Sequence, residues 1–255
     1  MINRGQVTIF IILAVVIAAV LLVVFYPRIK NVFIPSSPPV QIEDCVKKQL
    51  GNFVQEIASH GGSLEPVNFY LYNNKKIDYL CYTNEYYKTC VMQQPFIKQK
   101  FEDEISRFIS EKAKSCVGEL AANYKSKGYS VESRTGNVSV EIVPNSLKII
   151  VSMPVTLTKE TSETFDKFII TRPGNMYEIL IISQAILNYE ARYGDSIPED
   201  FMLLYPNLRI QKLKQSDGSK IYIVEDRDTK DSFTFATRSL SWPEGFGTQE
   251  KYVKV

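Results

Sequence analysis

The chain has 255 residues, of which 45% are hydrophobic and 23% are charged, with 30 Lys and Arg against 28 Asp and Glu. Without the N-terminal basic residues Arg4, Arg28 and Lys30, the remainder carries 27 basic and 28 acidic side chains, a net charge of −1. So balanced a charge disfavours a polyanion such as nucleic acid as partner. The composition also excludes collagen, a disordered tail and a small disulfide-dense scaffold.

Residues 7–26 predict a transmembrane helix. The 20 residues from Val7 to Tyr26 contain no charged side chain, and a helix of this length spans roughly 30 Å, the thickness of a bilayer's hydrocarbon core. The rival interpretation is a cleaved secretory signal, whose apolar core is normally shorter and is followed by a small-x-small cleavage site. The segment ends instead in Phe25-Tyr26-Pro27, which favours a retained single span with membrane lipid as a partner.

The residues around this segment's start resemble a processing signal. Residues 1–13 read MINRGQVTIFIIL, and Arg4, Gly5, Gln6 and Thr8 match the class III leader of archaeal type IV pilin-like proteins. The resemblance implies cleavage after Gly5, which would make Gln6 the new N-terminus and residues 1–6 a leader-like segment. The chain departs from the family at Phe10, where pilins carry an acidic residue that is thought to register neighbouring subunits.

A similar N-terminus also occurs in uncharacterised archaeal membrane-anchored proteins, and the resemblance extends further along the chain. It covers Asp44-Cys45-Val46 at a helix start, Gly61-Gly62 at a helix end and a second helix that bears a cysteine. Between the span and this region, residues 27–40 contain Pro27 and the run 34–39, IPSSPP. Consecutive prolines favour extended polyproline geometry, so residues 27–40 are predicted to be a semi-rigid linker.

Residues 41–255 are predicted to form an α+β domain of antiparallel strands and hairpins with three main helices. Helical periodicity places these helices at residues 42–57, 95–128 and 176–193, with a short helix at 201–204. Strands are expected at 69–72, 77–92 (with a turn near residue 84), 129–134, 138–143, 147–158, 168–170, 208–213, 221–224 and 233–237. Strand runs between isolated helices favour α+β over a doubly wound fold. A division into subdomains 41–128 and 129–255 is compatible with this pattern.

The four cysteines all follow the apolar segment: Cys45, Cys81, Cys90 and Cys116. Four cysteines allow three connectivities, which sequence alone does not settle. Cys81 and Cys90 flank a tight hairpin, and Cys45 and Cys116 lie on the apolar faces of two helices, so the pairs 45–116 and 81–90 are favoured. Buried free thiols remain the alternative, and the absence of a CxxC spacing disfavours a metal site.

The orientation across the membrane is nearly a tie by flanking charge, with Arg4 on one side and Arg28 and Lys30 on the other. Asn137-Val138-Ser139 is an N-glycosylation sequon at a predicted turn, which makes Asn137 a candidate acceptor. Together with an even number of cysteines, it favours a large C-terminal domain outside the cell.

A group of aromatic residues is the candidate interaction surface. Tyrosines cluster with Lys75, Lys76 and Lys88 around the first predicted hairpin, where aromatic platforms among cations can bind glycans or single strands. Ordinary strand packing explains the same pattern. The candidate residues are Tyr70, Tyr72, Tyr79, Tyr82, Tyr86 and Tyr87.

Catalytic, metal and cofactor motifs are not found in the sequence. The single histidine, His60, stands at a helix end, where it fits a capping role. Residues 225–231 carry three aspartates, but the EF-hand pattern fails at Lys230 and Asp231 and favours a solvated hairpin turn. Paired carboxylates remain open, because their spacing is set by the fold.

These observations predict a non-catalytic, single-pass membrane protein at the cell surface with a structural or interaction role. Its expected partners are membrane lipid, other copies of itself, and surface proteins or glycans, with no cofactor. A pilin-like filament subunit processed after Gly5 is the first alternative. A carboxylate-dependent ectoenzyme is the second.

Overall fold

The computed structural model describes residues 13–17, 20–21 and 37–241, and the chain divides into two units, residues 1–41 and 42–255. Residues 13–17 and 20–21 are helical. The rest of the predicted span 7–26 and the leader-like residues 1–6 lie outside the described residues. No helix among the described residues is both long enough and apolar enough to cross a membrane.

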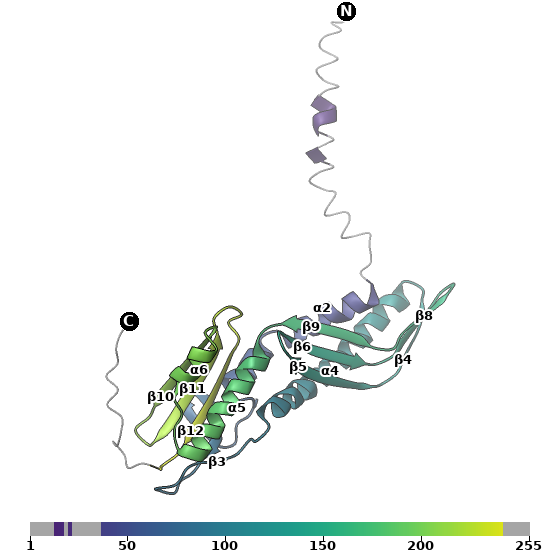
Figure 1. Ribbon diagram of the computed structural model, residues 1–255. Helices are drawn as coiled ribbons and strands as arrows, with labels where there is room; N and C mark the ends of the chain where they lie inside the picture. Colours follow the sequence, from purple (N-terminus) through teal and green to yellow (C-terminus); the bar gives the residue numbers. More distant parts are fainter. Residues whose placement is uncertain (1–12, 18–19, 22–36, 242–255) are drawn as a thin grey trace, which may run out of the picture. The chain divides into compact units, whose positions relative to one another are not determined.

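Figure 1 shows the arrangement of the helices and strands after residue 37, in which runs of strands follow α3, α4 and α6. The helices are α2 (Pro38–Leu50), α3 (Phe53–Ser59), α4 (Ile97–Ser126), α5 (Met176–Tyr193) and α6 (Pro198–Leu204). The strands are β1 (Phe69–Tyr72), β2 (Lys75–Tyr82), β3 (Val91–Met92), β4 (Ser130–Ser133), β5 (Asn137–Val143), β6 (Ser146–Ser152), β7 (Val155–Thr158), β8 (Ser162–Phe165), β9 (Phe168–Pro173), β10 (Leu208–Lys214), β11 (Ser219–Asp226) and β12 (Ser232–Arg238). The fold is α+β with mostly antiparallel sheets.

The largest sheet has six strands in the order β1-β2-β12-β11-β10, with β3 paired to β2. Every pairing in it is antiparallel except the one between β12 and β2, which is parallel. This sheet combines strands from both sides of residue 128, and residues 42–255 form one compact unit. The segments 41–128 and 129–255 therefore share one sheet.

Two three-stranded antiparallel sheets, β4-β7-β8 and β5-β6-β9, follow α4 in the chain. Strands β5, β6, β7 and β9 place every second side chain in the interior, as strands with one covered face do, whereas β4 and β8 contain no buried residue. In β5, for example, Val138, Val140 and Ile142 are buried, and this strand contacts α4. The long helix α4 thus supplies the apolar surface that these strands cover.

Helix α5 connects the six-stranded sheet to the β5-β6-β9 sheet. It contacts β2, β11 and β12 of the first sheet, and it also contacts β5, β6 and α4. Its buried face includes Ile179, Ile182 and Ile186. The helix follows Asn175 at its N-cap and ends at Gly194, whose φ of 80° is left-handed, as is typical of a helix C-cap glycine. This placement fixes the start of α5 beside the hairpin that joins β11 and β12.

The structure differs from the predicted elements at the first helix. Residues 42–57 do not form one helix, since α2 ends at Leu50 and α3 begins at Phe53, with Gly51 at a φ of 39° between them. Helix α2 also begins at Pro38, inside the predicted linker 27–40, because a proline needs no N–H partner in the first turn of a helix. Residues 37–241 therefore contain five helices, α2 to α6, where three main helices and one short helix were predicted.

Two disulfide bonds lie within the described residues. Cys45 of α2 is bonded to Cys116 of α4, and Cys81 of β2 is bonded to Cys90, just before β3. This is the pairing that the sequence favoured, and it leaves no free cysteine. Two such bonds are typical of a protein that folds in an oxidising compartment.

Candidate ligand pocket

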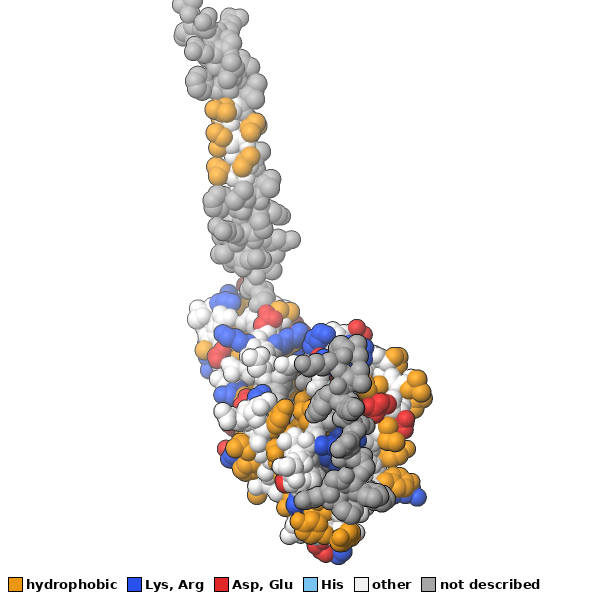
Figure 2. Space-filling model, turned by 90° about the vertical axis from the view of Figure 1, so that its left-hand side faces the viewer, with side chains coloured by type: hydrophobic (Ala, Val, Ile, Leu, Met, Phe, Trp, Pro, Cys, Tyr) orange, Lys and Arg blue, Asp and Glu red, His pale blue; other side chains and the backbone are white. Residues whose placement is uncertain are grey.

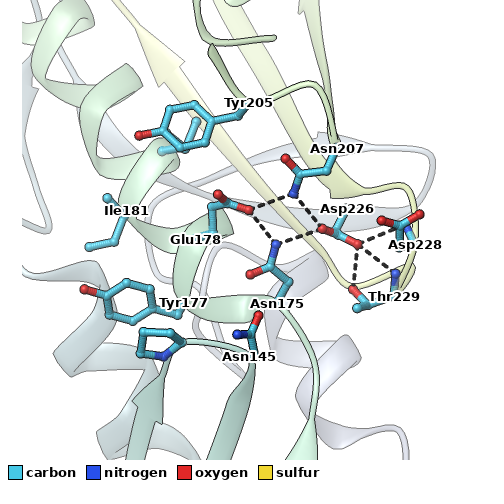
Figure 3. Close-up of a pocket in the computed structure, with 12 residues that line it drawn as sticks. Asn145, Asn175, Tyr177, Glu178, Ile181, Tyr205, Asn207, Asp226, Asp228 and Thr229 are labelled. Carbon is cyan, nitrogen blue, oxygen red and sulfur yellow. Dashed lines mark hydrogen bonds between the residues drawn. The ribbon is translucent and has the colours of Figure 1, made fainter. Parts of the chain in front are cut away.

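A pocket of about 480 Å³ opens beside the first turn of α5 (Figure 3). Four segments form it: the turn between β5 and β6, the start of α5, the connection between α6 and β10, and the hairpin between β11 and β12. The lining residues are Pro144, Asn145, Asn175, Tyr177, Glu178, Ile181, Ile182, Tyr205, Asn207, Asp226, Asp228 and Thr229. The lining holds three carboxylates and no basic side chain.

Two carboxylates and two amides form a closed ring of hydrogen bonds at the base of this pocket (Figure 3). Asn175 Nδ2 donates to Glu178 Oε2 at 2.6 Å and to Asp226 Oδ2 at 2.8 Å. Asn207 Nδ2 donates to the same two oxygens, at 2.7 Å and 3.0 Å. An amide NH₂ group has two N–H donors, and each asparagine donates both of them to the carboxylates.

Asp226 uses its other carboxylate oxygen to hold the β11–β12 hairpin. Oδ1 accepts hydrogen bonds from the backbone N–H of Asp228 at 2.9 Å and of Thr229 at 2.7 Å, and from the Thr229 hydroxyl at 3.1 Å. Burial opposes ionisation of this group. The hydrogen bonds from Thr229, Asn175 and Asn207 outweigh the burial and lower the pKa of Asp226 to about 2. Asp226 is therefore ionised at neutral pH, and both of its carboxylate oxygens accept hydrogen bonds.

Asp231, at the other end of the same hairpin, holds the entry to α5. Its Oδ2 accepts the backbone N–H of Asn175 at 3.0 Å, and its Oδ1 accepts a charge-assisted bond from Arg172 at 3.1 Å. Gly174 passes close to this carboxylate, and a Cβ at that position would lie only 2.2 Å from Asp231 Oδ2. Asp231 thus satisfies the N-cap N–H at the positive end of the helix dipole.

Several polar atoms of the lining take part in no hydrogen bond within the described residues. They are Glu178 Oε1, the side-chain oxygens of Asn175 and Asn207, the hydroxyls of Tyr177 and Tyr205, the side-chain amide of Asn145 and the carboxylate of Asp228. In Figure 3 the free oxygens of Glu178 and Asn175 point away from the bonded ring, toward the side of Tyr177, Ile181 and Tyr205. Ile181 is 44% exposed, so this side of the pocket is accessible.

The tyrosines that the sequence offered as an interaction surface fall into two groups. Four of them, Tyr70, Tyr72, Tyr79 and Tyr82, pack with Ile77, Ile221 and Ala236 in a small hydrophobic cluster. Tyr79 is only 6% exposed, and its hydroxyl shares a 2.7 Å hydrogen bond with Ser219. Tyr86 and Tyr87 are 62% and 75% exposed, in the loop closed by the Cys81–Cys90 bond. Of the six candidate tyrosines, these two are the ones classed as exposed to solvent.

The other predicted positions take ordinary places in the fold. His60 is the C-cap residue of α3, which fits its predicted capping position. Asn137, the sequon residue, is the first residue of β5 and is exposed. Gly5 and Gln6, the predicted processing site, lie outside the described residues. Within the described part, no group of three or more His, Cys, Asp or Glu residues has the arrangement of a metal site.

The sequence predicted the hairpin at residues 225–231 but not the pocket beside it. A turn does join β11 to β12 there, yet Asp226 and Asp231 are each only 2% exposed, so the prediction of a solvated turn is wrong for both carboxylates. The spacing of Asn175 and Glu178, an N-cap residue and its N3 acid, was the one local signal available. Nothing local marks Asn207 or Asp226 as their partners.

A second polar cluster, buried between α5 and β11, lies apart from the pocket lining. Glu190 is 0% exposed, and its carboxylate accepts bonds from Lys220 at 3.0 and 2.9 Å and from the Tyr222 hydroxyl. Lys220 also reaches the Gly194 carbonyl at 2.6 Å and Asp195 at 3.0 Å. Burial raises the pKa of Glu190, against the opposing charge of Lys220. This cluster ties the end of α5 to the main sheet.

No protein-family model, no curated protein and no solved structure matches this chain. Function is therefore inferred from the geometry of the pocket and from the sequence.

Proposed function

We propose that this protein is a single-pass membrane protein whose extracytoplasmic α+β domain binds a ligand in the pocket beside α5 without transforming it. The uncharged run of 20 residues, Val7 to Tyr26, supports the membrane anchor. The two disulfides support an oxidising location for the domain. The proposed orientation has the N-terminus in the cytoplasm, residues 7–26 in contact with membrane lipid and residues 41–255 outside the cell.

The observation that carries the binding role is that Asp226, the carboxylate next to Glu178 in the hydrogen-bonded ring, already accepts hydrogen bonds on both oxygens. Hydrolysis by a carboxylate pair needs one group that is protonated near neutral pH and ready to give up its proton. Asp226 has a pKa of about 2 and accepts hydrogen bonds on both oxygens, so it does not supply that proton. Asp228 lies on the far side of Asp226 from Glu178 (Figure 3).

What remains accessible suits recognition better than proton transfer. The lining offers Glu178 Oε1, the free amide oxygens of Asn175 and Asn207, the Asn145 amide and two tyrosines, together with an apolar side chain, Ile181. Small-molecule sites typically combine such apolar walls with a few fixed polar groups. The polar groups here are held in place by the hydrogen-bonded ring, so little ordering remains to be done when a ligand binds.

The full chain in phosphatidylcholine nanodiscs offers a direct test by methyl NMR. The Ile181 signal is assigned with the Ile181→Val variant, and Ile169, which is 54% exposed on β9, serves as the control methyl. Neutral saccharides, organic anions and organic cations are then titrated separately. We expect one class to shift Ile181 but not Ile169, with the ligand's own spectrum unchanged over a day. A ligand that is converted contradicts the non-catalytic role, and a panel that leaves Ile181 unmoved contradicts binding.

A further inference from the structure

We infer that the pocket beside α5 recognises an organic cation with N–H donors, an alkylammonium or guanidinium group, held between Tyr177 and Tyr205 against Glu178. The inference rests on the proposed binding function and names the class of ligand. Three independent properties of the lining support it: its free hydrogen-bonding atoms, its charge and its aromatic walls (Figure 3).

The free polar atoms of the ring are all acceptors. The N–H groups of Asn175 and Asn207 already point at the two carboxylates. This leaves Glu178 Oε1 and the two amide oxygens without a donor among the described residues. Ammonium and guanidinium groups are donors only, so they match this set. A saccharide hydroxyl also needs donors for its own oxygen, and among the lining side chains only the tyrosine hydroxyls and the Asn145 amide could supply them.

The charge of the lining selects in the same direction. Glu178, Asp226 and Asp228 contribute carboxylates, and the lining contains no Lys, Arg or His. Arg172, a half-buried cation just before α5, is already paired with Asp231 at 3.1 Å. An anion entering this pocket would meet like charge without a compensating base, whereas a cation is attracted to it.

The walls provide the third property. Tyr205 and Tyr177 lie on opposite sides of Ile181 and Glu178 in Figure 3. Aromatic faces attract cations, most strongly when water is excluded. The exposed Ile181 between them offers an apolar contact for the alkyl stem that carries the cationic group. A free amine and the side chain of a Lys or Arg on a partner protein share this chemistry.

The test uses the full chain in phosphatidylcholine nanodiscs, with Ile181 methyl shifts and calorimetry as readouts. Butylguanidinium and butylammonium represent free cations, and the blocked tripeptide Gly-Arg-Gly represents a protein side chain. Butylurea and the matching Gly-citrulline-Gly tripeptide are the neutral isosteres, and butanoate is the anion. We expect both kinds of cation to shift Ile181, the isosteres to bind at least tenfold more weakly, and butanoate to have no effect. Binding should weaken as salt is added.

Matched variants locate the effect. Glu178→Gln keeps the size of the side chain and removes its charge, so we expect at least tenfold weaker cation binding, while Glu163→Gln on exposed β8 should leave it unchanged. Tyr205→Leu should weaken binding and Tyr205→Phe should not, since Phe retains the ring. The tyrosine pair keeps the test decisive even if Glu178→Gln fails to fold.

The outcomes separate the two proposals. The cation inference is overturned if butylurea binds as tightly as butylguanidinium. It is also overturned if added Ca²⁺ shifts the Ile181 signal and neither organic cation does. Saccharides or anions that shift Ile181 when the cations do not overturn the inference and leave the binding function standing. An Ile181 signal that no probe of any class moves overturns both. Shifts with the tripeptide but not the free cations identify a protein partner as the source, and the reverse identifies a small amine.

Discussion

At the scale of single residues, Lys220 is the cation that pairs with the buried carboxylate of Glu190. Its amine bonds both oxygens of Glu190, which is 0% exposed, and only 10% of the Lys220 side chain is itself exposed. Removing one partner of such a pair leaves an uncompensated buried charge, which typically costs about 3–5 kcal/mol. We therefore expect Lys220→Met to lower the free energy of unfolding by that amount in denaturant titrations.

Two controls separate the ion pair from ordinary truncation. Lys125→Met changes an exposed lysine in the last turn of α4 and should shift the free energy of unfolding by less than about 0.5 kcal/mol. The double variant Glu190→Met, Lys220→Met should recover most of the loss, because neither charge is then buried alone. A double variant as unstable as the single one would show that shape, rather than charge, explains the effect.

Asp226 makes a prediction about acid stability. Its pKa of about 2 in the folded protein lies below its ordinary value of 3.8. The ionised form is therefore favoured by folding, so this contribution is fully present above pH 3.8 and is lost as the pH falls toward 2. We expect the wild type to lose about 1–2 kcal/mol from this group across that window, since part of the hairpin reaches solvent.

The variant Asp226→Asn checks this sign. It should be less stable than the wild type at pH 7, and the difference should shrink between pH 4 and pH 2, measured by chemical denaturation at each pH. Asp228→Asn, on the exposed part of the same turn, is the matched control and should show no such convergence. A constant gap between Asp226→Asn and the wild type across the window would contradict the role given to Asp226.

The sequence could predict the pocket only where partners are close in the chain. Asn175 and Glu178 are one helical turn apart, a spacing that marks a helix start in any protein. Asn207 and Asp226 join them from a connection and a hairpin that come much later, and their position depends on how β10 and β11 pair in the main sheet. The acceptor-rich side of the pocket is a property of that tertiary arrangement, which no local pattern encodes.

At the scale of elements, the two disulfides should contribute unequally. The Cys45–Cys116 bond closes a sequence separation of 71 residues and ties α2 to α4, whereas Cys81–Cys90 closes a separation of 9. By loop-closure entropy the first bond stabilises the fold by about 4 kcal/mol and the second by about 3 kcal/mol. We expect the Cys45→Ala, Cys116→Ala pair to unfold at lower denaturant than the Cys81→Ala, Cys90→Ala pair.

The measurement is the free energy of unfolding of the two double variants against the wild type under non-reducing conditions. Adding a reductant to the wild type should give a loss at least as large as that of the first double variant. If the two double variants prove equally stable, loop length does not govern these bonds. A short-loop variant that is the less stable of the two would instead indicate that Cys81–Cys90 holds the packing of β2 and β3.

The predicted helices are confirmed where an apolar stripe extends over many turns, and the prediction is wrong where a single residue ends a helix. Helices α4 and α5 lie within the predicted ranges because their apolar stripes extend over many turns. Gly51 broke the first predicted helix with a φ of 39°, which the surrounding apolar pattern conceals. The parallel pairing of β2 with β12 could not be predicted either, because these strands are far apart in the sequence and no turn connects them.

At the scale of the whole molecule, the membrane anchor is the main prediction still to be checked. Residues 7–26 carry no charge, and a retained span keeps the chain in the membrane fraction after washing with salt and alkali. Protease added from outside intact cells should then remove residues beyond the linker 27–40 and leave the span protected. Full protection of the domain would contradict the proposed orientation, and release by salt would contradict the anchor.

Intact-mass measurement of the native protein decides how its N-terminus is processed. We expect a chain that retains residues 7–26, because Phe25-Tyr26-Pro27 offers no small-x-small cleavage site. A chain beginning at Gln6 would support pilin-type processing after Gly5, and a retained Met1 would exclude it. A chain beginning after Tyr26 would contradict the membrane anchor altogether.

Processing at Gly5 would not by itself imply a filament. The fifth residue of the processed chain would be Phe10, which lacks the carboxylate that registers neighbouring subunits in the pilins this N-terminus resembles. From the sequence, Pro27 is also expected to interrupt the helix that in pilins typically continues into the head domain. We therefore expect the processed protein to form no filaments in electron micrographs of cell surfaces and of shear fractions. The variant Phe10→Glu restores the missing acid and is the comparison for this test. Filaments formed by the wild type would favour the pilin-like alternative over a solitary ligand-binding protein.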